Sequence, residues 1–338
     1  MSDILLDVKN LEVSFHTYSG EVKAVRNISF DLKRGETIAI VGESGSGKSV
    51  TSKAIMQLIH KPGEIKSTSS IKLEDKELVG LSYNEMRKYR GEQVSMIFQD
   101  ALASLNPTRR IGQQVAESLI IHHGVPKKEA LLQAVEMLRL VKVPDPERRA
   151  RQYPHEFSGG MRQRAMIAMA LINKPKVLIA DEPTTALDVT VQAQIMELIA
   201  DMKEEIGTSV ILITHDLGVV AGAAARVFVM YGGKIVESGS TEEIFYNPKH
   251  PYTWALLNSV PRLNIAHKEE LYSIKGTPPD LLTPPAGCPF APRCDHRMSI
   301  CNRLLPEEFE ISQGHTSSCW LSHEKAPVVD VFQKLEVQ

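Results

Sequence analysis

A glycine-rich stretch, GESGSGKS at residues 42–49, limits the possible folds of this chain more than any other feature. It matches the Walker A pattern GxxxxGK[ST]: backbone N–H groups surround phosphate oxygens, the lysine reaches the outer phosphates, and the last hydroxyl ligates Mg²⁺. The stretch lies between a predicted strand at 37–41 and a predicted helix at 50–59. This order predicts a nucleotide site made of Gly42, Ser44, Gly45, Ser46, Gly47, Lys48, Ser49 and the following Val50.

Strand patterns alternate with helical patterns along most of the chain. Residues 4–15 and 22–32 alternate between apolar and polar positions, which predicts half-buried strands. Short apolar runs at 94–98, 177–180 and 210–214 predict buried strands, and the apolar spacing within about 105–143 and 189–202 predicts helices. A hairpin is predicted at 226–237. The alternation indicates an α/β fold in which helices pack on a mostly parallel sheet.

The character of the sequence changes after about residue 261. Proline pairs and all four cysteines replace the long apolar runs there. A chain of 338 residues is long enough for two domains. We therefore predict a nucleotide-binding domain at 1–260, in which helical patterns gather at about 105–173, and a small irregular module at 261–338.

Composition excludes several classes of protein. Hydrophobic residues make up 43% and charged residues 24% of the chain, as in ordinary globular proteins. The net charge of −2 argues against a nucleic-acid partner, which would favour a basic face. The N-terminus lacks the pattern of a signal peptide, and no run of about 18 apolar residues is present. These features predict a cytoplasmic protein that can still dock on a membrane protein.

Polar side chains follow three of the predicted strands directly. Asp181 and Glu182 follow the strand at 177–180, Gln99 follows the strand at 94–98, and His215 follows the strand at 210–214. In an open parallel sheet, ligands bind at this edge. Asp181 can hold the Mg²⁺ shell, and Glu182 can accept a proton from the water that attacks the γ-phosphate. The alternative for His215 is a helix-capping or core histidine.

A second glycine pair precedes the apolar run that begins near residue 161. Ser158, Gly159 and Gly160 leave backbone N–H groups uncovered at the start of a predicted helix. Such a helix N-terminus favours an anion. The sequence thus contains two candidate phosphate-binding elements.

These motifs follow one another in the same order as in the ABC-transporter ATPases, and the chain resembles that family. The resemblance covers residues 1 to about 260, and Ala186, Leu187 and Asp188 extend it. It implies an ABC ATPase fold, with a mostly parallel RecA-like sheet, an N-terminal antiparallel β subdomain and a helical subdomain. It also implies Mg²⁺-dependent ATP hydrolysis in a head-to-tail dimer, where the Walker A loop of one subunit faces Ser158, Gly159 and Gly160 of the other.

The resemblance also implies roles for single residues. Gln99 would contact Mg²⁺ and couple to the membrane subunit, Asp188 would bridge the two sites, and His215 would contact the γ-phosphate. Together with Lys48 and Glu182, Gln99 and His215 form the predicted catalytic set. An aromatic ring, Phe15 or Tyr18, would stack on adenine. The family signature LSGGQ is FSGGM in this chain, with a glutamine at 163, so the contact expected at residue 161 is open.

Two further stretches narrow the subfamily. FQDALASLNP at 98–107 and NPKHPYTWALLNSVP at 247–261, followed by the C-terminal extension, are similar to D-type ATPase subunits of dipeptide and oligopeptide permeases. The resemblance implies that the chain powers peptide import. One alternative is the ATPase of a nickel or other small-solute importer, which the cysteine module argues against. A remote alternative is a non-transport ABC ATPase, which a single cassette without a coiled-coil insertion argues against.

The same resemblance implies partners and location. These are a homologous ATPase subunit, two transmembrane permease subunits and an extracytoplasmic peptide-binding protein, with no nucleic acid. Self-dimerisation of the isolated subunit stays open. The expected location is the cytoplasm, peripheral on the inner face of the cell membrane.

The four cysteines are separated by gaps of 5, 6 and 17 residues. Structural zinc sites usually contain pairs two to four residues apart, so an iron–sulfur cluster suits this spacing better. Zinc and unliganded buried thiols are the alternatives. The resemblance to the peptide importers implies a [4Fe–4S] cluster on Cys288, Cys294, Cys301 and Cys319. We interpret the nearby His296 and His315 as loop residues.

Overall fold

The computed structural model describes residues 3–185, 187–259, 273–327 and 329. The chain divides into two compact units, each assembled from segments that are distant in sequence. The predicted domain boundary between residues 260 and 261 lies outside the described residues, and that division stays a prediction. Unit 1 comprises residues 1–3, 32–37 and 80–213, and unit 2 comprises residues 4–31, 38–79 and 214–338.

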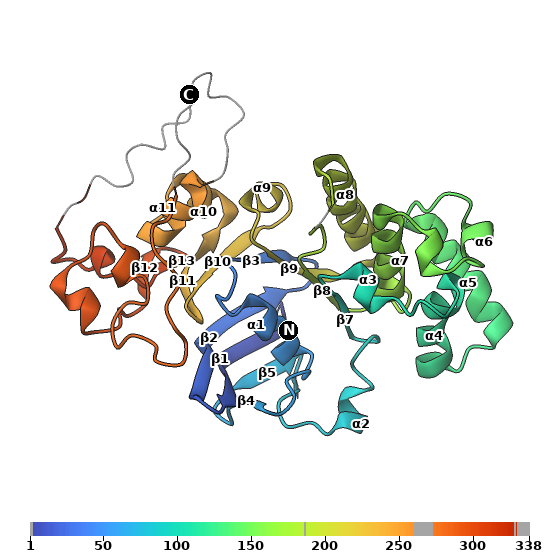
Figure 1. The fold of residues 1–338 in the computed structure, drawn as a ribbon, viewed down its shortest axis with the longest axis horizontal. Coiled ribbons are helices and arrows are strands. Elements are labelled where there is room, and N and C mark those ends of the chain that lie inside the picture. The colour runs from blue at the N-terminus through green and yellow to red at the C-terminus, as the bar shows by residue number, and fades with distance from the viewer. Residues whose placement is uncertain (1–2, 186, 260–272, 328, 330–338) are drawn as a thin grey trace, which may run out of the picture. The chain divides into compact units, whose positions relative to one another are not determined.

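An antiparallel sheet is formed by the N-terminal part of unit 2 (Figure 1). The two long strands were predicted from their alternation. The three short ones were not, since strands of two to four residues carry too little periodicity. The strands are β1 (Ile4–Thr17), β2 (Gly20–Lys33), β4 (Gly63–Ile65), β5 (Ser70–Leu73) and β6 (Lys76–Glu77), with β1 paired to β2, β4 and β5.

A second sheet in unit 2 contains the strand that leads into the Walker A loop. In this unit the strand order is β12-β13-β11-β10-β3, and only the β3–β10 pair is parallel. The C-terminal module is therefore less irregular than predicted, because it adds two strands beside β11. The elements are β3 (Thr37–Val41), α1 (Lys48–Ile55), β10 (Arg226–Tyr231), β11 (Lys234–Ser240), β12 (Phe309–Ser312) and β13 (His315–Ser317).

An aromatic core connects the elements at the C-terminal side of unit 2. The rings of Tyr231 and Tyr252 lie 4.5 Å apart between centroids, and Phe290 lies 5.2 Å and 5.3 Å from them. All three side chains are buried. The remaining helices are α9 (Leu217–Val220), α10 (Thr241–Tyr246), α11 (Pro251–Asn258) and the short 3₁₀ helices Ala291–Arg293, Ser299–Asn302 and Trp320–Ser322.

Unit 1 combines three parallel strands with a group of helices (Figure 1). The helical pattern predicted over about 105–143 forms two helices, because Gly124 ends the first in a left-handed conformation and Pro126 precedes the second. The elements are β7 (Val94–Ile97), β8 (Val177–Asp181), β9 (Ser209–Thr214), α2 (Tyr83–Met86), α3 (Ala101–Ser104), α4 (Ile111–His123), α5 (Lys127–Leu140), α6 (Pro146–Arg149), the 3₁₀ helix Pro154–Glu156, α7 (Gly159–Leu171) and α8 (Val189–Ile206).

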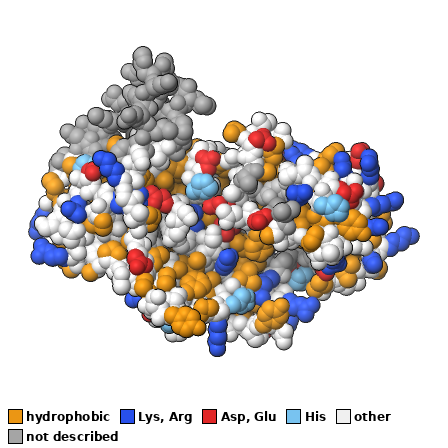
Figure 2. All heavy atoms as spheres, viewed as in Figure 1, with side chains coloured by type: hydrophobic (Ala, Val, Ile, Leu, Met, Phe, Trp, Pro, Cys, Tyr) orange, Lys and Arg blue, Asp and Glu red, His pale blue; other side chains and the backbone are white. Residues whose placement is uncertain are grey.

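Cationic, acidic and apolar side chains are interspersed on the face seen in Figure 2. This mixture agrees with the small net charge of −2. Within the described part of the chain, no helix combines the length and the hydropathy that a membrane crossing requires.

Candidate functional site

The Walker A loop requires glycine at two positions where another part of the backbone comes close. Gly42 has φ 150°, and a Cβ there would lie 2.1 Å from the Met230 carbonyl oxygen. Gly47 has φ 105°, and its Cβ would lie 2.6 Å from the Ala24 carbonyl oxygen. Any side chain would displace β10 or β2. The two glycines thus let the loop lie directly on the backbone of unit 2.

The polar groups of this loop suit a phosphate ligand. Lys48 is buried, and its Nζ donates to the carbonyl oxygens of Gly42 and Glu43 at 2.7 Å and 2.9 Å. The Ser46 hydroxyl is buried and has no hydrogen-bond partner in the described chain. Ser44 and Gly45 are exposed, and Ser49 and Val50 are half-buried at the start of α1. Donors beside a helix N-terminus fit ATP phosphates with Mg²⁺.

Glu43 in this loop is held by two residues from the C-terminal part of unit 2. Its backbone N–H donates to the Tyr252 hydroxyl at 2.8 Å. Its carboxylate accepts two hydrogen bonds from the Arg293 guanidinium, at 2.7 Å and 3.2 Å. Arg293 uses its other donors on the Tyr231 hydroxyl and on the carbonyl oxygens of Ile274 and Lys275. The loop is therefore braced by a fully hydrogen-bonded arginine.

In unit 1, two of the predicted catalytic residues are in direct contact. The Gln99 amide donates to the Glu182 carboxylate at 2.7 Å, and the Thr185 hydroxyl donates to the same oxygen at 2.9 Å. Glu182 has φ 49°, a conformation that costs energy for a residue other than glycine. Asp181, at the end of β8, is buried. Thr185 was not predicted as a site residue, because nothing in the sequence marks its contact with Glu182.

The second glycine pair opens α7. The Ser158 hydroxyl accepts a hydrogen bond from the Met161 N–H at 3.4 Å and so caps the helix. Ser158 and Gly159 are exposed. A Cβ at Gly160 would lie 3.0 Å from the Val191 side chain, so the absence of a side chain also allows α7 to lie close to α8. The start of α7 is therefore exposed at Ser158 and Gly159, and its two glycines carry no side chain that would block access to the backbone.

Gln163 does not take the place of a glutamine at residue 161. It is buried, and its amide donates to the Pro183 carbonyl oxygen within the same unit. This bond ties α7 to the segment that follows Glu182. The sequence reveals the glutamine but not its inward orientation.

The other predicted site residues occupy different positions. Asp188 caps α8, with its carboxylate accepting from the Val191 N–H at 3.0 Å, and His215 directly follows β9 and is exposed. Phe15 is half-buried, and its ring lies where a Cβ of Gly63 would be. Tyr18 is fully exposed. Ala186 lies outside the described residues.

All four cysteines line one small cavity in unit 2. Three of them are buried and Cys294 is half-buried. Burial raises the pKa of Cys288 and Cys294 to about 11 and the pKa of Cys319 to about 12. Neighbouring cysteines have a smaller effect in the same direction. Thiols with such pKa values are protonated at neutral pH, so a metal would have to displace their protons.

The positions of the sulfurs limit which group fits. No three of the cysteine sulfurs lie within 4.8 Å of one another in the described chain. A tetrahedral zinc site with Zn–S bonds of about 2.3 Å would need separations of roughly 3.8 Å. In a four-iron cluster each thiolate binds a different iron, which spaces the sulfurs more widely. The cavity is about 10 Å³, so a cluster would also require the thiols to separate. The four thiols thus form a candidate donor set whose sulfur positions differ from those of a tetrahedral zinc site.

A buried histidine also lines this cavity. The Nδ1 of His250 accepts from the Tyr252 N–H at 3.0 Å and caps α11. Burial lowers the pKa of His250 to about 3, so the ring is neutral and its proton is on Nε2. This Nε2 is buried without a hydrogen-bond partner among the described residues. His250 therefore offers an N–H group beside the cysteines.

Our interpretation of His315 as a loop residue is wrong. It lies in β13, fully buried, and its Nε2 is 2.9 Å from a carboxylate oxygen of Glu237, which is also buried. Glu237 accepts from the backbone N–H groups of Lys249 and His250 as well. His315 thus contributes to a buried polar network that positions His250. His296, in contrast, is half-buried at the cysteine cavity.

Two family models match the chain. The model described as ABC transporter matches residues 25–185. The model described as oligopeptide/dipeptide transporter, C-terminal region, matches residues 236–301. The second match contains α11 and three of the four cysteines.

Curated relatives match almost the whole chain. The oligopeptide transport ATP-binding protein OppD of Bacillus subtilis is 56% identical over 326 residues, which is 96% of this chain and 91% of the relative. The dipeptide transport ATP-binding protein DppD of the same organism is 56% identical over 322 residues, covering 95% and 96%.

Solved structures share the fold. A dimeric post-hydrolysis state of the ATP-binding cassette MJ0796, bound to ADP and Pi, has a TM-score of 0.63 and 28% identity over 70% of this chain and 98% of that chain. The structure of cbiO1 from Clostridium perfringens, part of the ABC transporter complex cbiONQ, has a TM-score of 0.61 and 29% identity, covering 73% and 92%.

Proposed function

This chain belongs to the ATP-binding subunits of ABC transporters, and from this premise we propose that it hydrolyses ATP to power the import of dipeptides or oligopeptides. The observation that carries the proposal is the combination of a complete set of ATPase motifs with a C-terminal region of the oligopeptide/dipeptide transporter type. Its relatives at 56% identity are named as oligopeptide and dipeptide transport ATP-binding proteins.

Each predicted site residue has its own role in ATP hydrolysis. Lys48 and the loop N–H groups would bind the outer phosphates, and Ser49, Asp181 and Gln99 would hold Mg²⁺, which would neutralise phosphate charge. Glu182 accepts a proton from the attacking water, with its carboxylate oriented by hydrogen bonds from Gln99 and Thr185. His215 contacts the γ-phosphate.

The exposed start of α7 supports a head-to-tail dimer. Ser158, Gly159 and Gly160 offer uncovered N–H groups that have no phosphate in their own unit to bind. We infer that they close over ATP held by the Walker A loop of a homologous subunit, with Asp188 at the same interface. Phe15 is the better candidate for the adenine-stacking ring, since its side chain is held against β4 while Tyr18 is fully exposed.

The proposed complex contains two transmembrane permease subunits and an extracytoplasmic peptide-binding protein, with this subunit at the cytoplasmic face of the membrane. Uptake into proteoliposomes of the intact complex tests the function. We expect ATP-dependent accumulation of a labelled dipeptide or tetrapeptide and none of nickel ions. Accumulation of nickel without peptide would refute the proposal and favour the small-solute alternative.

We further propose that Cys288, Cys294, Cys301 and Cys319 bind a [4Fe–4S] cluster. Support comes from four soft ligands around one cavity, with separations too wide for tetrahedral zinc. Anaerobically purified protein is expected to contain about four irons per chain, and Cys301→Ala to lose most of them. Metal analysis that found zinc, or neither metal, would contradict the assignment.

His250 is expected to tune such a cluster. Because its Nε2–H lacks a partner beside the cysteines, we infer that it donates to a sulfur and favours the reduced, more negative state. His250→Asn should lower the midpoint potential by roughly 50 mV, since one hydrogen bond is worth about 1 kcal/mol. Asparagine can still cap α11, so stability should change little.

The potential is measured by anaerobic redox titration followed by electron paramagnetic resonance. His296→Asn, at a half-buried position of the same cavity, is the matched control and should shift the potential less. An unchanged potential in His250→Asn would leave His250 as a helix cap alone.

A further inference from the structure

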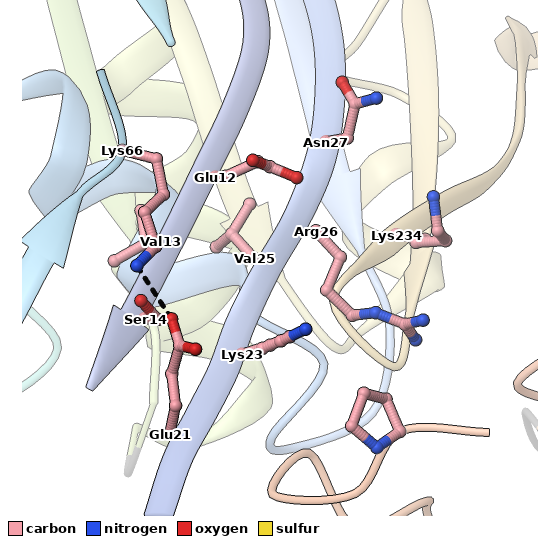
Figure 3. Close-up of a pocket in the computed structure, with 11 residues that line it drawn as sticks. Glu12, Val13, Ser14, Glu21, Lys23, Val25, Arg26, Asn27, Lys66 and Lys234 are labelled. Carbon is pink, nitrogen blue, oxygen red and sulfur yellow. Dashed lines mark ion pairs between the residues drawn. The ribbon is translucent and has the colours of Figure 1, made fainter. Parts of the chain in front are cut away.

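A polar pocket of about 470 Å³ lies in unit 2. Figure 3 shows its lining, in which most side chains come from β1 and β2 and Lys234 comes from the start of β11. Its volume is typical of a small-molecule site. None of residues 42–49 contributes to the lining.

The lining includes the strand that carries the predicted adenine ring. Glu12, Val13 and Ser14 of β1 line the pocket, and Phe15, the next residue, does not.

Positive charge exceeds negative charge in the lining. Four cations, Lys23, Arg26, Lys66 and Lys234, face two carboxylates, Glu12 and Glu21, which leaves a net charge of +2. Burial lowers the pKa of Arg26, and burial together with nearby Arg26 lowers the pKa of Lys234. Glu12 opposes the shift of Lys234, so the main cause of both shifts is burial of the cation.

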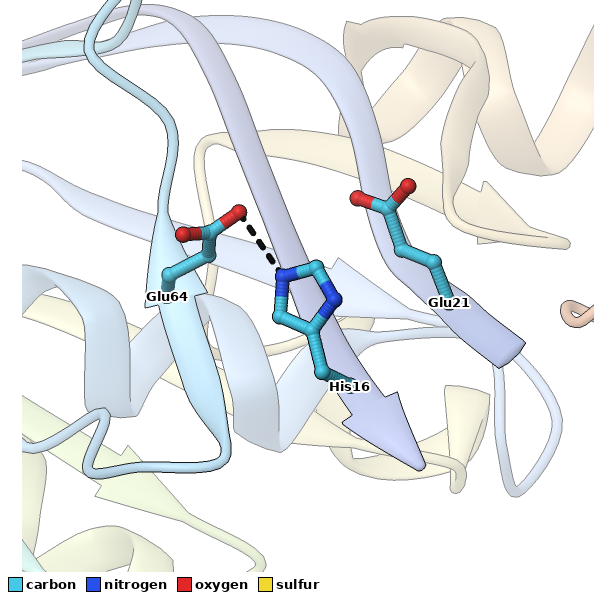
Figure 4. Close-up of side chains that lie close together, drawn as sticks. All are labelled: His16, Glu21 and Glu64. Atoms are coloured by element: carbon cyan, nitrogen blue, oxygen red, sulfur yellow. Dashed lines mark hydrogen bonds and ion pairs between the residues drawn. The ribbon is translucent and has the colours of Figure 1, made fainter. Parts of the chain in front are cut away.

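Only one of the cations is paired. Lys66 Nζ lies 2.8 Å from the Glu21 carboxylate and also pairs with Glu64. Figure 4 shows Glu64 beside His16, at 3.0 Å, and Glu21 nearby. His16, Glu21 and Glu64 are close enough to ligate a metal ion, but the Lys66 ammonium already pairs with both carboxylates.

The other cations have no such partner. The Arg26 guanidinium donates to the Gly232 carbonyl oxygen at 3.4 Å, and no carboxylate pairs with Arg26 or Lys234 in the described chain. Two half-buried cations that face one cavity repel each other, and an anion between them would relieve this repulsion. Arginine with lysine is also the usual combination for binding phosphate.

We propose that this pocket binds a phosphate dianion, either free or as the monoester group of a small metabolite. The net charge of +2 matches a dianion, and the volume leaves room for a small organic group. Pro284 completes the lining, and the neighbouring Leu281 carbonyl accepts from the Lys23 N–H at 2.9 Å.

The test is calorimetric titration of full-length protein with inorganic phosphate, with ribose 5-phosphate and with ribose. All titrations use a Lys48→Ala background, which removes the lysine that would bind phosphate at the Walker A loop. We expect binding of one or both phosphates and none of ribose. Binding of both identifies the free dianion as sufficient, and binding of the monoester alone assigns part of the affinity to the sugar.

Variants of the lining distinguish this site from others. Arg26→Gln and Lys234→Gln should each weaken binding roughly 10- to 100-fold, because each removes a charged hydrogen bond. Glu12→Gln should tighten binding about threefold by removing a repulsive charge. Lys72→Gln, at an exposed lysine of β5, is the matched control and should leave binding unchanged.

Thermal unfolding of each variant shows that the fold is retained. Two results would overturn the proposal: no phosphate binding in the Lys48→Ala background, or equal binding by the parent, Arg26→Gln and Lys234→Gln. The second result would place the anion elsewhere on the surface.

Discussion

A Glu182→Gln variant is expected to bind ATP with nearly unchanged affinity and to hydrolyse it roughly 10²- to 10⁴-fold more slowly. The glutamine keeps an oxygen that can accept from Gln99 and Thr185, so the local structure should persist. It cannot accept a proton from water. Steady-state phosphate release measures the loss, and binding of a fluorescent ATP analogue measures the affinity.

Glu204→Gln provides the matched control for this loss. Glu204 lies on α8 with a side chain that is 79% exposed, and its replacement should leave turnover unchanged. If Glu182→Gln released phosphate at a rate near that of the parent protein, Glu182 would not be the proton acceptor. A loss of ATP affinity of the same size would assign Glu182 to binding instead.

Arg293→Ala is expected to lower the free energy of unfolding by about 3–5 kcal/mol. The Arg293 side chain is 6% exposed and makes a two-bond ion pair with Glu43, whose side chain is 24% exposed, so truncation leaves a carboxylate without its partner. ATP affinity should fall as well, because Glu43 belongs to the Walker A loop. Urea denaturation measures the first effect, and ATP titration the second.

Two substitutions separate charge from geometry. Arg293→Lys keeps the charge but cannot reproduce five directed hydrogen bonds, so we expect most of the loss to remain. Arg303→Ala replaces an exposed arginine of the same module and should change stability by less than about 0.5 kcal/mol. Equal stability of Arg293→Ala and Arg303→Ala would show that the contacts of Arg293 with Glu43 do not contribute to the free energy of unfolding.

Much of the fold could be predicted from local pattern. The predicted ABC ATPase fold is confirmed, and the strand at 37–41 has the bounds that its apolar run indicated. The helical reading across 105–143 missed a break at Gly124, although Gly-Val-Pro marks it in the sequence. The strands β12 and β13 were missed because the pairing of β13 with β11 depends on residues about 80 positions apart.

The candidate site likewise contains residues that a local motif marks and residues that only the fold brings together. Motifs predicted Lys48, Asp181 and Glu182, because each belongs to a short stretch with a distinctive pattern. Partners that act through long-range contacts, such as Arg293 on Glu43 and Gln163 on Pro183, have no signal in a single sequence. His250 could have been suspected from the HPY stretch, but only the fold places it beside the cysteines.

The contacts of Glu43 have a consequence for how the chain is made. The Walker A loop is synthesised early, yet its partners Tyr252 and Arg293 lie 209 and 250 positions later. During translation from the N-terminus, the loop therefore remains without its brace until the ribosome has passed Arg293. A chain truncated before Arg293 would likewise lack the two hydrogen bonds that the arginine donates to Glu43.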